Sequence, residues 1–382
     1  MQEEEDKLVE LDPEENISPL NGDATGEQEG ADFDPKDIDI AMEQRSLYAL
    51  ITRMRSDMID LNTEFQRSGN LWDDYYQSRL IESVLLRFPL PAFYFDASDD
   101  DKWLVVDGLQ RLSAMKNFVI DKKLKLNGLE VLKELNGFRY EDLAHKMRLR
   151  IDDFQVMVYL IKPGTPKAVK YDIFNRINTG GLTLTSQEIR HALNQKIAAP
   201  FFKNLVYNPD AAAPEYSEKY TRYINVNDKR MAGRELILRF IAFKRAGWEN
   251  YKPTLRRFLD TEMGRIEQGV DAELLDMVEQ LWKALHVAHL LFGKHLFSKS
   301  LANPQGRRLL NSSLFEVWTV LLSELSEAEQ QKLLENKDGL VKGFIGCLLN
   351  AEFQKAITSS TTSKANVNLR FTWINEVIKH SL

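Results

Sequence analysis

A stretch of mostly polar residues, Asp107-Gly108-Leu109-Gln110-Arg111, stands between two segments of different periodicity. The apolar run Trp103–Val106 predicts a strand, and the spacing of the next ten residues predicts a helix. A helix N-terminus binds phosphate, Gly108 would let the backbone approach a ligand, and Arg111 could donate two hydrogen bonds to it. Asp107 could orient Arg111, hold a metal ion or act as a base. The simpler alternative is a helix capped by Asp107, with Arg111 paired to a surface carboxylate.

A second polar group surrounds the glycine pair that follows the predicted helix 167–177. It consists of Asn175, Arg176, Asn178, Thr179 and Gly180. This group predicts a cradle for a phosphate or a sugar, although a glycine pair is also an ordinary helix end. Glu188, three residues after Thr185, is either the N3 member of a capping box or a further binding residue.

Gln66 and Arg67 form a second Gln-Arg pair that, like Gln110 and Arg111, follows a predicted strand. Two such pairs in one α/β domain suggest two arginines that converge on one anion. Two unrelated surface arginines are the alternative. Together these groups predict a site for a ligand that carries phosphate.

The histidines and the single cysteine give weaker indications of a functional site. His286 and His289 have a spacing that permits metal ligation, but no carboxylate or cysteine partner is evident, so we expect no metal site. His191 is either a proton-transfer group near the site or a partly exposed helix residue. The single Cys347 has apolar neighbours, cannot form an internal disulfide and indicates a reducing cytoplasm.

In the C-terminal half, two basic segments could contact nucleic acid. Arg256-Arg257 and the segment from Thr358 to Arg370 carry cations that could reach phosphates. Solvated helix faces and a loop are the ordinary explanation for both.

The expected elements divide the chain into three parts. Residues 1–40 carry 15 Asp and Glu against 2 Lys, so we expect a disordered acidic tail that either aids solubility or covers a basic site in the body. Residues 41–200 alternate predicted strands (58–62, 92–95, 103–106, 154–161) with predicted helices (46–51, 73–87, 110–120, 167–177, 186–194). Residues 201–382 show helical periodicity almost throughout. The expected fold is α+β, with an α/β domain followed by an all-α helical domain.

The charge and hydropathy of the whole chain limit its partners. The net charge of −7 is set by the tail, since residues 41–382 carry a net charge of +6, which permits a nucleic-acid partner. No apolar stretch approaches the length of a bilayer span, and the acidic N-terminus is no secretory signal. We therefore expect a cytoplasmic protein without a membrane partner.

Three motifs, in the same order along the chain, resemble those of the GmrSD N-terminal-type family, which has a ParB/sulfiredoxin-like fold. The chain resembles a single-module member of this family. The family's DGQQR-type motif is similar to Asp107–Arg111. Its upstream signature is similar to Phe65-Gln66-Arg67, Trp72, 80–85 and Pro89-Leu90-Pro91, and its downstream block to 174–189. The resemblance extends over about 41–382 and implies a component of a bacterial restriction or anti-phage system.

The resemblance implies an activity on nucleotides or DNA, either as an NTPase or as a nickase or endonuclease, with Mg²⁺ and an NTP as cofactors. Asp107, Gln110 and Arg111 would be catalytic. The ligand would bind Gln66, Arg67, Gly108, Asn175, Arg176, Asn178, Thr179, Gly180 and Glu188. The alternative is a non-catalytic regulator that binds DNA or a nucleotide and controls a partner nuclease.

Two features depart from the family pattern. Leu109 replaces the first Gln of the motif, which matters if that side chain touches the ligand and is harmless if it faces the core. Residues 201–382 contain no His-Asn-His nuclease arrangement, so cleavage of both DNA strands would need a partner nuclease subunit.

Overall fold

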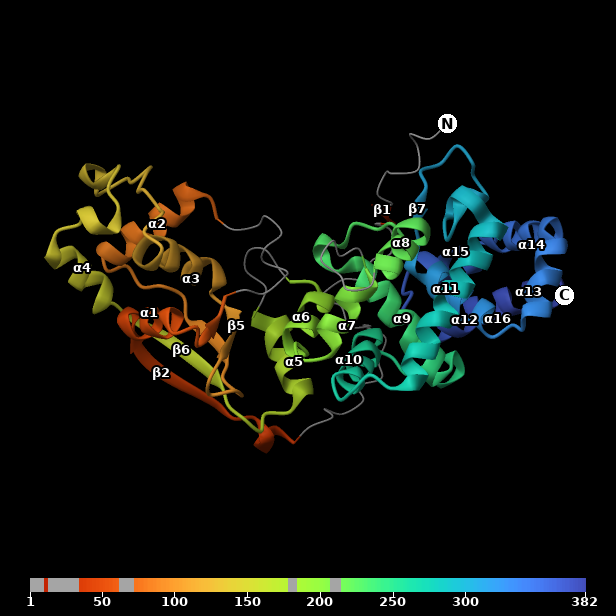
Figure 1. The fold of residues 1–382 in the computed structure, drawn as a ribbon, viewed down its shortest axis with the longest axis horizontal. Coiled ribbons are helices and arrows are strands. Elements are labelled where there is room, and N and C mark those ends of the chain that lie inside the picture. The colour runs from red at the N-terminus through yellow and green to blue at the C-terminus, as the bar shows by residue number, and fades with distance from the viewer. Residues whose placement is uncertain (1–9, 13–33, 62–71, 178–183, 207–213) are drawn as a thin grey trace. The chain divides into compact units, whose positions relative to one another are not determined.

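The computed structural model describes residues 10–12, 34–61, 72–177, 184–206 and 214–382 (Figure 1). Two compact units are present. The α/β unit comprises 29–184, and the helical unit comprises 185–382 together with the N-terminal residues up to 28. The division after Leu184 falls before the boundary at residue 200 expected from the sequence. The reason is packing, because α6 (Ser186–Leu193) and α7 (Ala198–Leu205) contact α9 (Ala232–Ala246) and α10 (Leu255–Ile266).

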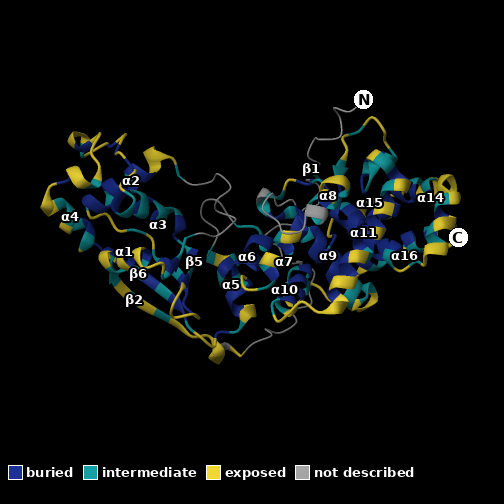
Figure 2. Cartoon of the chain, viewed as in Figure 1, coloured by how far each residue is buried: buried dark blue, intermediate teal, exposed yellow. Residues whose placement is uncertain are grey.

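A mixed sheet forms the centre of the α/β unit. In the described residues it has five strands in the order β2-β6-β4-β5-β3. Their bounds are β2 Ile40–Ser46, β3 Ile59–Asp60, β4 Phe93–Asp96, β5 Trp103–Asp107 and β6 Gln155–Ile161. The pairs β2–β6 and β4–β5 are antiparallel, whereas β4–β6 and β3–β5 are parallel. The edge strand β2 was not predicted from the sequence and alternates exposed with half-buried residues (Figure 2).

Helices cover one face of this sheet (Figure 1). They are α1 Leu47–Arg55, α2 Asp74–Leu85, α3 Leu109–Met115 with a π-helical turn at Lys116–Ile120, and α4 His145–Asp152. Ser46 and Asp73 cap α1 and α2 through their side-chain oxygens. The alternating residues of the strands, such as Phe93, Phe95 and Val158, pack with these helices into one apolar core. A further helix, α5 (Lys167–Ile177), contacts β5.

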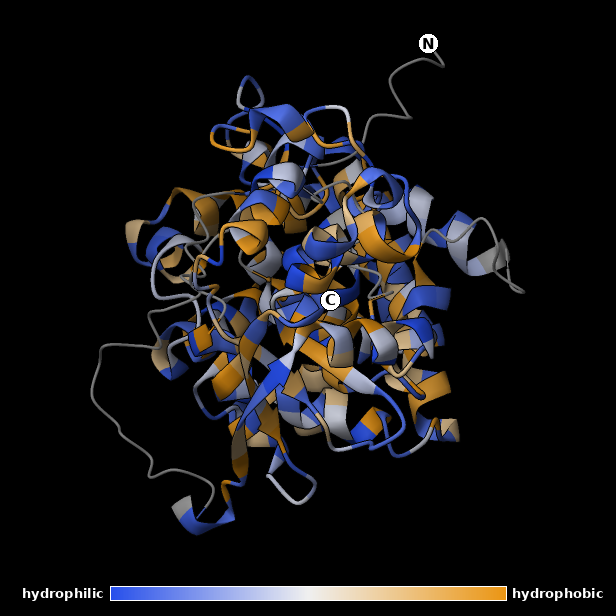
Figure 3. Ribbon diagram, turned by 90° about the vertical axis from the view of Figure 1, so that its left-hand side faces the viewer, coloured by the Kyte–Doolittle hydropathy of each residue, from blue (hydrophilic) through white to orange (hydrophobic). Residues whose placement is uncertain are grey.

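The helical unit has its own apolar core, centred on α9, α11 and α12. Hydrophilic and hydrophobic residues are interleaved along the helices of the chain, as expected for helices that bury one face (Figure 3). The helices not yet given are α8 Pro214–Tyr223, α11 Ala272–Phe292, α12 Ser312–Ser323, α13 Glu327–Glu335, α14 Lys337–Leu349, α15 Ala351–Thr358 and α16 Lys364–Lys379.

The N-terminal tail contributes a strand to the helical unit. Glu10–Leu11 (β1) pairs in parallel with Leu309–Leu310 (β7), and the amide of Asp12 donates to the Leu310 carbonyl over 2.9 Å. The prediction of a tail disordered over residues 1–40 was therefore wrong for residues 10–12 and for the start of β2. Pairing across such a long separation supplies backbone partners that local composition does not reveal.

The predicted fold class is confirmed, with a mixed α/β region followed by a largely helical one. The helical periodicity expected for residues 201–382 corresponds to helices such as α10 and α11. Among the described residues, no helix combines the length and the apolar character that a bilayer crossing requires.

Candidate functional site

The motif Asp107–Arg111 forms the turn from β5 into α3. Asp107 ends the strand, and Gly108 adopts a left-handed conformation with φ of +101°. A Cβ at this position would lie 2.4 Å from Cδ1 of Phe93, so both the backbone conformation and the close approach require glycine. The predicted strand–turn–helix is therefore confirmed, although no side chain caps the N-terminus of α3.

Arg111 points back at the chain that enters β4. Its Nη1 donates to the Pro91 carbonyl, and its Nη2 donates to the Ala92 carbonyl over 3.1 Å. Nη2 also donates to Oδ2 of Asp107 over 2.7 Å, and the guanidinium lies 4.4 Å from the centroid of the Phe93 ring. Burial lowers the pKa of Arg111, while Asp107 opposes that shift. The residue thus fastens the start of β4 to the motif.

Asp107 is the more accessible member of this ion pair. Its side chain is 36% exposed, whereas that of Arg111 is 10% exposed. The alternative in which Asp107 caps the helix is wrong, because this carboxylate accepts from Arg111 and no side chain caps α3. A carboxylate held in place by an arginine and open to solvent can accept a proton or bind a metal ion.

Leu109 and Gln110 have structural neighbours. Leu109 is 8% exposed and belongs to the core of the α/β unit. Its departure from the family motif is therefore of the harmless kind, since the position faces the core. Oε1 of Gln110 accepts the backbone N–H of Trp72 over 2.9 Å, which links α3 to the segment before α2.

Only part of the second polar group, the one around the glycine pair, lies within the described residues. Nδ2 of Asn175 donates to the Tyr171 carbonyl one turn earlier in α5, and Arg176 is exposed near the end of that helix. Asn178, Thr179 and Gly180 lie outside the described residues, as do Gln66 and Arg67. Whether these residues meet Arg111 or Asp107 therefore stays a prediction.

Glu188 forms the capping box. It accepts the backbone N–H of Thr185, whose hydroxyl accepts the backbone N–H of Glu188 in return. Its carboxylate also bonds Arg230 at 2.8 Å, and the residue is 1% exposed. The capping-box alternative is confirmed, and this role already occupies the carboxylate that was also considered for ligand binding.

An aromatic pair near the motif was not identified from the sequence. Tyr94 on β4 and Tyr159 on β6 stack with ring centroids 4.7 Å apart and planes 7° apart. Tyr94 is in register with both Tyr159 and Asp107, so the three side chains form a row across adjacent strands. Burial raises the pKa of Tyr94, with further contributions from Tyr159 and Asp107. The signal was the alternation in Phe93-Tyr94-Phe95, which directs the tyrosine away from the helix-covered core.

The histidines and Cys347 provide no metal centre in the described part of the chain, where no cluster of three potential ligands is found. His286 and His289 both contact Tyr223. His191 is 3% exposed, so the expectation of a partly exposed helix residue was wrong. Cys347 is buried as predicted, and burial raises the pKa of its thiol.

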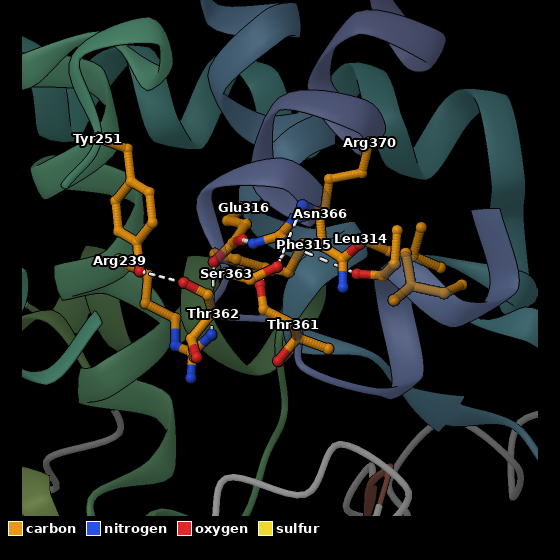
Figure 4. A network of polar contacts seen from close by, with 12 residues as sticks. Arg239, Tyr251, Leu314, Phe315, Glu316, Thr361, Thr362, Ser363, Asn366 and Arg370 are labelled. Atoms are coloured by element: carbon orange, nitrogen blue, oxygen red, sulfur yellow. Dashed lines mark hydrogen bonds and ion pairs between the residues drawn. The ribbon is translucent and has the colours of Figure 1, made fainter. Parts of the chain in front are cut away.

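The phosphate contact considered for Arg370 was wrong. Arg370 is 1% exposed and bonds Glu316 and the Thr361 carbonyl inside the helical unit (Figure 4). Its guanidinium is therefore unavailable to a nucleic acid.

The fold and the site define the class of protein. It has a mixed α/β unit with a polar strand–helix turn, followed by a largely helical unit. Residues 48–195 match the family described as GmrSD restriction endonuclease, N-terminal domain. The match contains both the 107–111 motif and the 174–189 block. Comparison with curated proteins and with solved structures gave no match.

Proposed function

We propose that the protein is a restriction-system component whose α/β unit binds a nucleotide or DNA and acts on it through Asp107. The observation that carries this proposal is the Asp107 carboxylate, which Arg111 fixes in place and which stays accessible beside the Tyr94–Tyr159 pair. The family of residues 48–195 supports the restriction context.

In this proposal Arg111 is a positioning residue, because the main-chain carbonyls of Pro91 and Ala92 already engage its guanidinium. Its hydrogen bond to Oδ2 of Asp107 orients that carboxylate. The stacked Tyr94 and Tyr159 rings would lie beside a bound base or sugar. Gln66, Arg67 and Asn178 are the groups that we expect to supply phosphate contacts.

Mg²⁺ and an NTP are the proposed cofactors. Mg²⁺ is commonly held by one or two carboxylates together with substrate phosphates and water. Asp107 suits that role as one protein ligand, since its carboxylate is accessible. Bound Mg²⁺ would supply charge stabilisation of the transferring phosphoryl group.

The alternative is a regulator without turnover that binds DNA or a nucleotide and controls a partner nuclease subunit. The use of Arg111 for main-chain contacts favours it, because phosphoryl transfer needs a cation on the developing charge. On this alternative Asp107 would position a ligand and perform no chemistry.

Phosphate release from several NTPs, with Mg²⁺ and with or without DNA, tests the proposal. We expect Asp107→Asn, which preserves an acceptor for Arg111, to reduce the rate by about 100-fold or more. Asp74→Asn, at an exposed position on α2, is the matched control and should leave the rate unchanged. Equal rates for the parent and Asp107→Asn would refute a catalytic Asp107. Nucleotide or DNA binding without any release would support the regulator.

A further inference from the structure

The connection between α11 and α12 is basic over its whole length. Residues 293–308, here called the basic segment, contain Lys294, Lys299, Arg307 and Arg308 and no acidic residue. Lys294, Arg307 and Arg308 are exposed. Lys294 and Arg308 both lower the pKa of His295, in addition to the larger effect of burial. The basic segment therefore adds four cations and no anion to the helical unit.

An acidic strand from the far end of the chain lies on this segment. Glu10 pairs with Arg307, and Oδ2 of Asp12 lies 2.8 Å from Nζ of Lys299. Nδ2 of Asn311 lies 3.5 Å from the same Asp12 oxygen. The side chain of Asp12 is 1% exposed, so the helical unit encloses this carboxylate.

The docked strand resembles a nucleic-acid backbone in its charge pattern. Residues two apart in an extended strand point to the same side and lie about 6.6 Å apart, so Glu10 and Asp12 present a row of negative charges. Residues 1–40 as a whole carry a net charge of −13, which opposes a second polyanion at the same place. Lys294 and Arg308 remain exposed while the strand is docked.

We propose that the basic segment is a binding surface for duplex DNA and that the acidic residues 10–12 occupy it as a competitor. DNA is the polyanion that the GmrSD-type domain on the same chain indicates. DNA displaces the strand and takes over Lys299 and Arg307. The surface lies in the helical unit and goes beyond the site at Asp107, so its test measures DNA binding and no hydrolysis.

The experiment measures the affinity of the full chain for a fluorescent DNA duplex by anisotropy over a series of salt concentrations. Glu10→Gln with Asp12→Asn removes the charged contacts of the docked strand. We expect about tenfold tighter binding, because Lys299 and Arg307 become available to phosphates. The slope of log affinity against log salt should steepen by about 1.8, as each new phosphate contact adds about 0.9. Hydrogen exchange at Leu309 and Leu310 reports whether the strand has left.

Glu14→Gln with Glu15→Gln is the matched control for the tail, because it makes the same charge change outside the docked strand. It should change affinity less than about twofold. Equal gains from the two pairs would overturn the proposal, since net charge alone would then explain them. If exchange shows that the strand stays docked, Leu11→Ser is added to the first pair, and unchanged affinity after release would also overturn it.

The basic surface has its own test. Lys294→Glu with Arg308→Glu, which leaves the strand contacts intact, should weaken DNA binding at least about tenfold. Lys332→Glu with Lys342→Glu makes the same charge change at exposed positions on α13 and α14 and is the control. Equal weakening by both pairs, or no weakening by the first, would refute the surface.

Discussion

The two units treat their buried arginines differently. In the helical unit each of three buried arginines meets carboxylates from side chains. Arg190 bonds Asp260 at 2.8 Å, Arg239 bonds Glu235 at 2.9 Å, and Arg370 pairs with Glu316 (Figure 4). The three arginines and Glu316 are buried, and the side chains of Asp260 and Glu235 are 12% and 20% exposed, so the charges neutralise one another largely away from solvent.

In the α/β unit, Arg111 also bonds two main-chain carbonyls, as Arg370 does, and its one carboxylate partner in the described residues is Asp107. That partner is 36% exposed, whereas Glu316 is fully buried. The difference indicates which carboxylate is available to act on a ligand. A buried arginine with enclosed partners is structural, whereas an arginine that holds an accessible carboxylate prepares that carboxylate to act on a ligand.

The largest effect is expected in the helical unit. Glu316→Gln removes the charge that both Arg239 and Arg370 face, and leaves two buried cations without it. The free energy of unfolding, measured in urea, should fall by about 3 to 5 kcal/mol. Glu327→Gln changes a carboxylate whose side chain is 92% exposed and should alter stability by less than about 0.5 kcal/mol. A small loss of unfolding free energy in Glu316→Gln would show that the paired charges do not stabilise the helical unit.

Arg111→Lys is expected to have the next largest effect. One ammonium group cannot reach Pro91, Ala92 and Asp107 together, so main-chain acceptors are left unpaired. Unfolding free energy should fall by about 2 to 3 kcal/mol. Arg176→Lys, at an exposed position, serves as the control. If Arg111→Lys is as stable as the parent, the guanidinium does not fasten β4, and the structural role of Arg111 is disproved.

Gly108→Ala tests the turn between strand and helix. The positive φ and the contact with Phe93 should together cost about 2 kcal/mol of stability. Gly164→Ala is a close match, since its φ is +95° and no neighbour lies within 4 Å of the added Cβ. It should cost about 1 kcal/mol from the backbone alone. Thermal unfolding of both variants isolates the steric part, and equal losses would show that the approach of Phe93 is unimportant.

Local sequence signals predicted the elements better than their partners. The capping box at Thr185 and Glu188 needs only four residues, and the structure has it as expected. The partners of Arg111 lie about twenty residues upstream, and β1 meets β7 from the other end of the chain. Such contacts depend on tertiary packing, which periodicity does not contain. That Leu109 faces the core is likewise decided by how α3 packs on the sheet.

The smallest effect is expected at His191 in the helical unit, where the stability should depend on pH. Burial lowers its pKa well below the ordinary value, and Arg234 and Arg190 lower it further. Its Nε2 is buried without a hydrogen-bond partner in the described residues. Because the unfolded chain binds the proton first, its contribution to stability is present above about pH 6.5 and is lost as the pH falls below it. Urea unfolding should lose about 1 kcal/mol per pH unit there beyond the loss in His191→Leu. An identical pH dependence in both proteins would show that burial does not lower the pKa of His191.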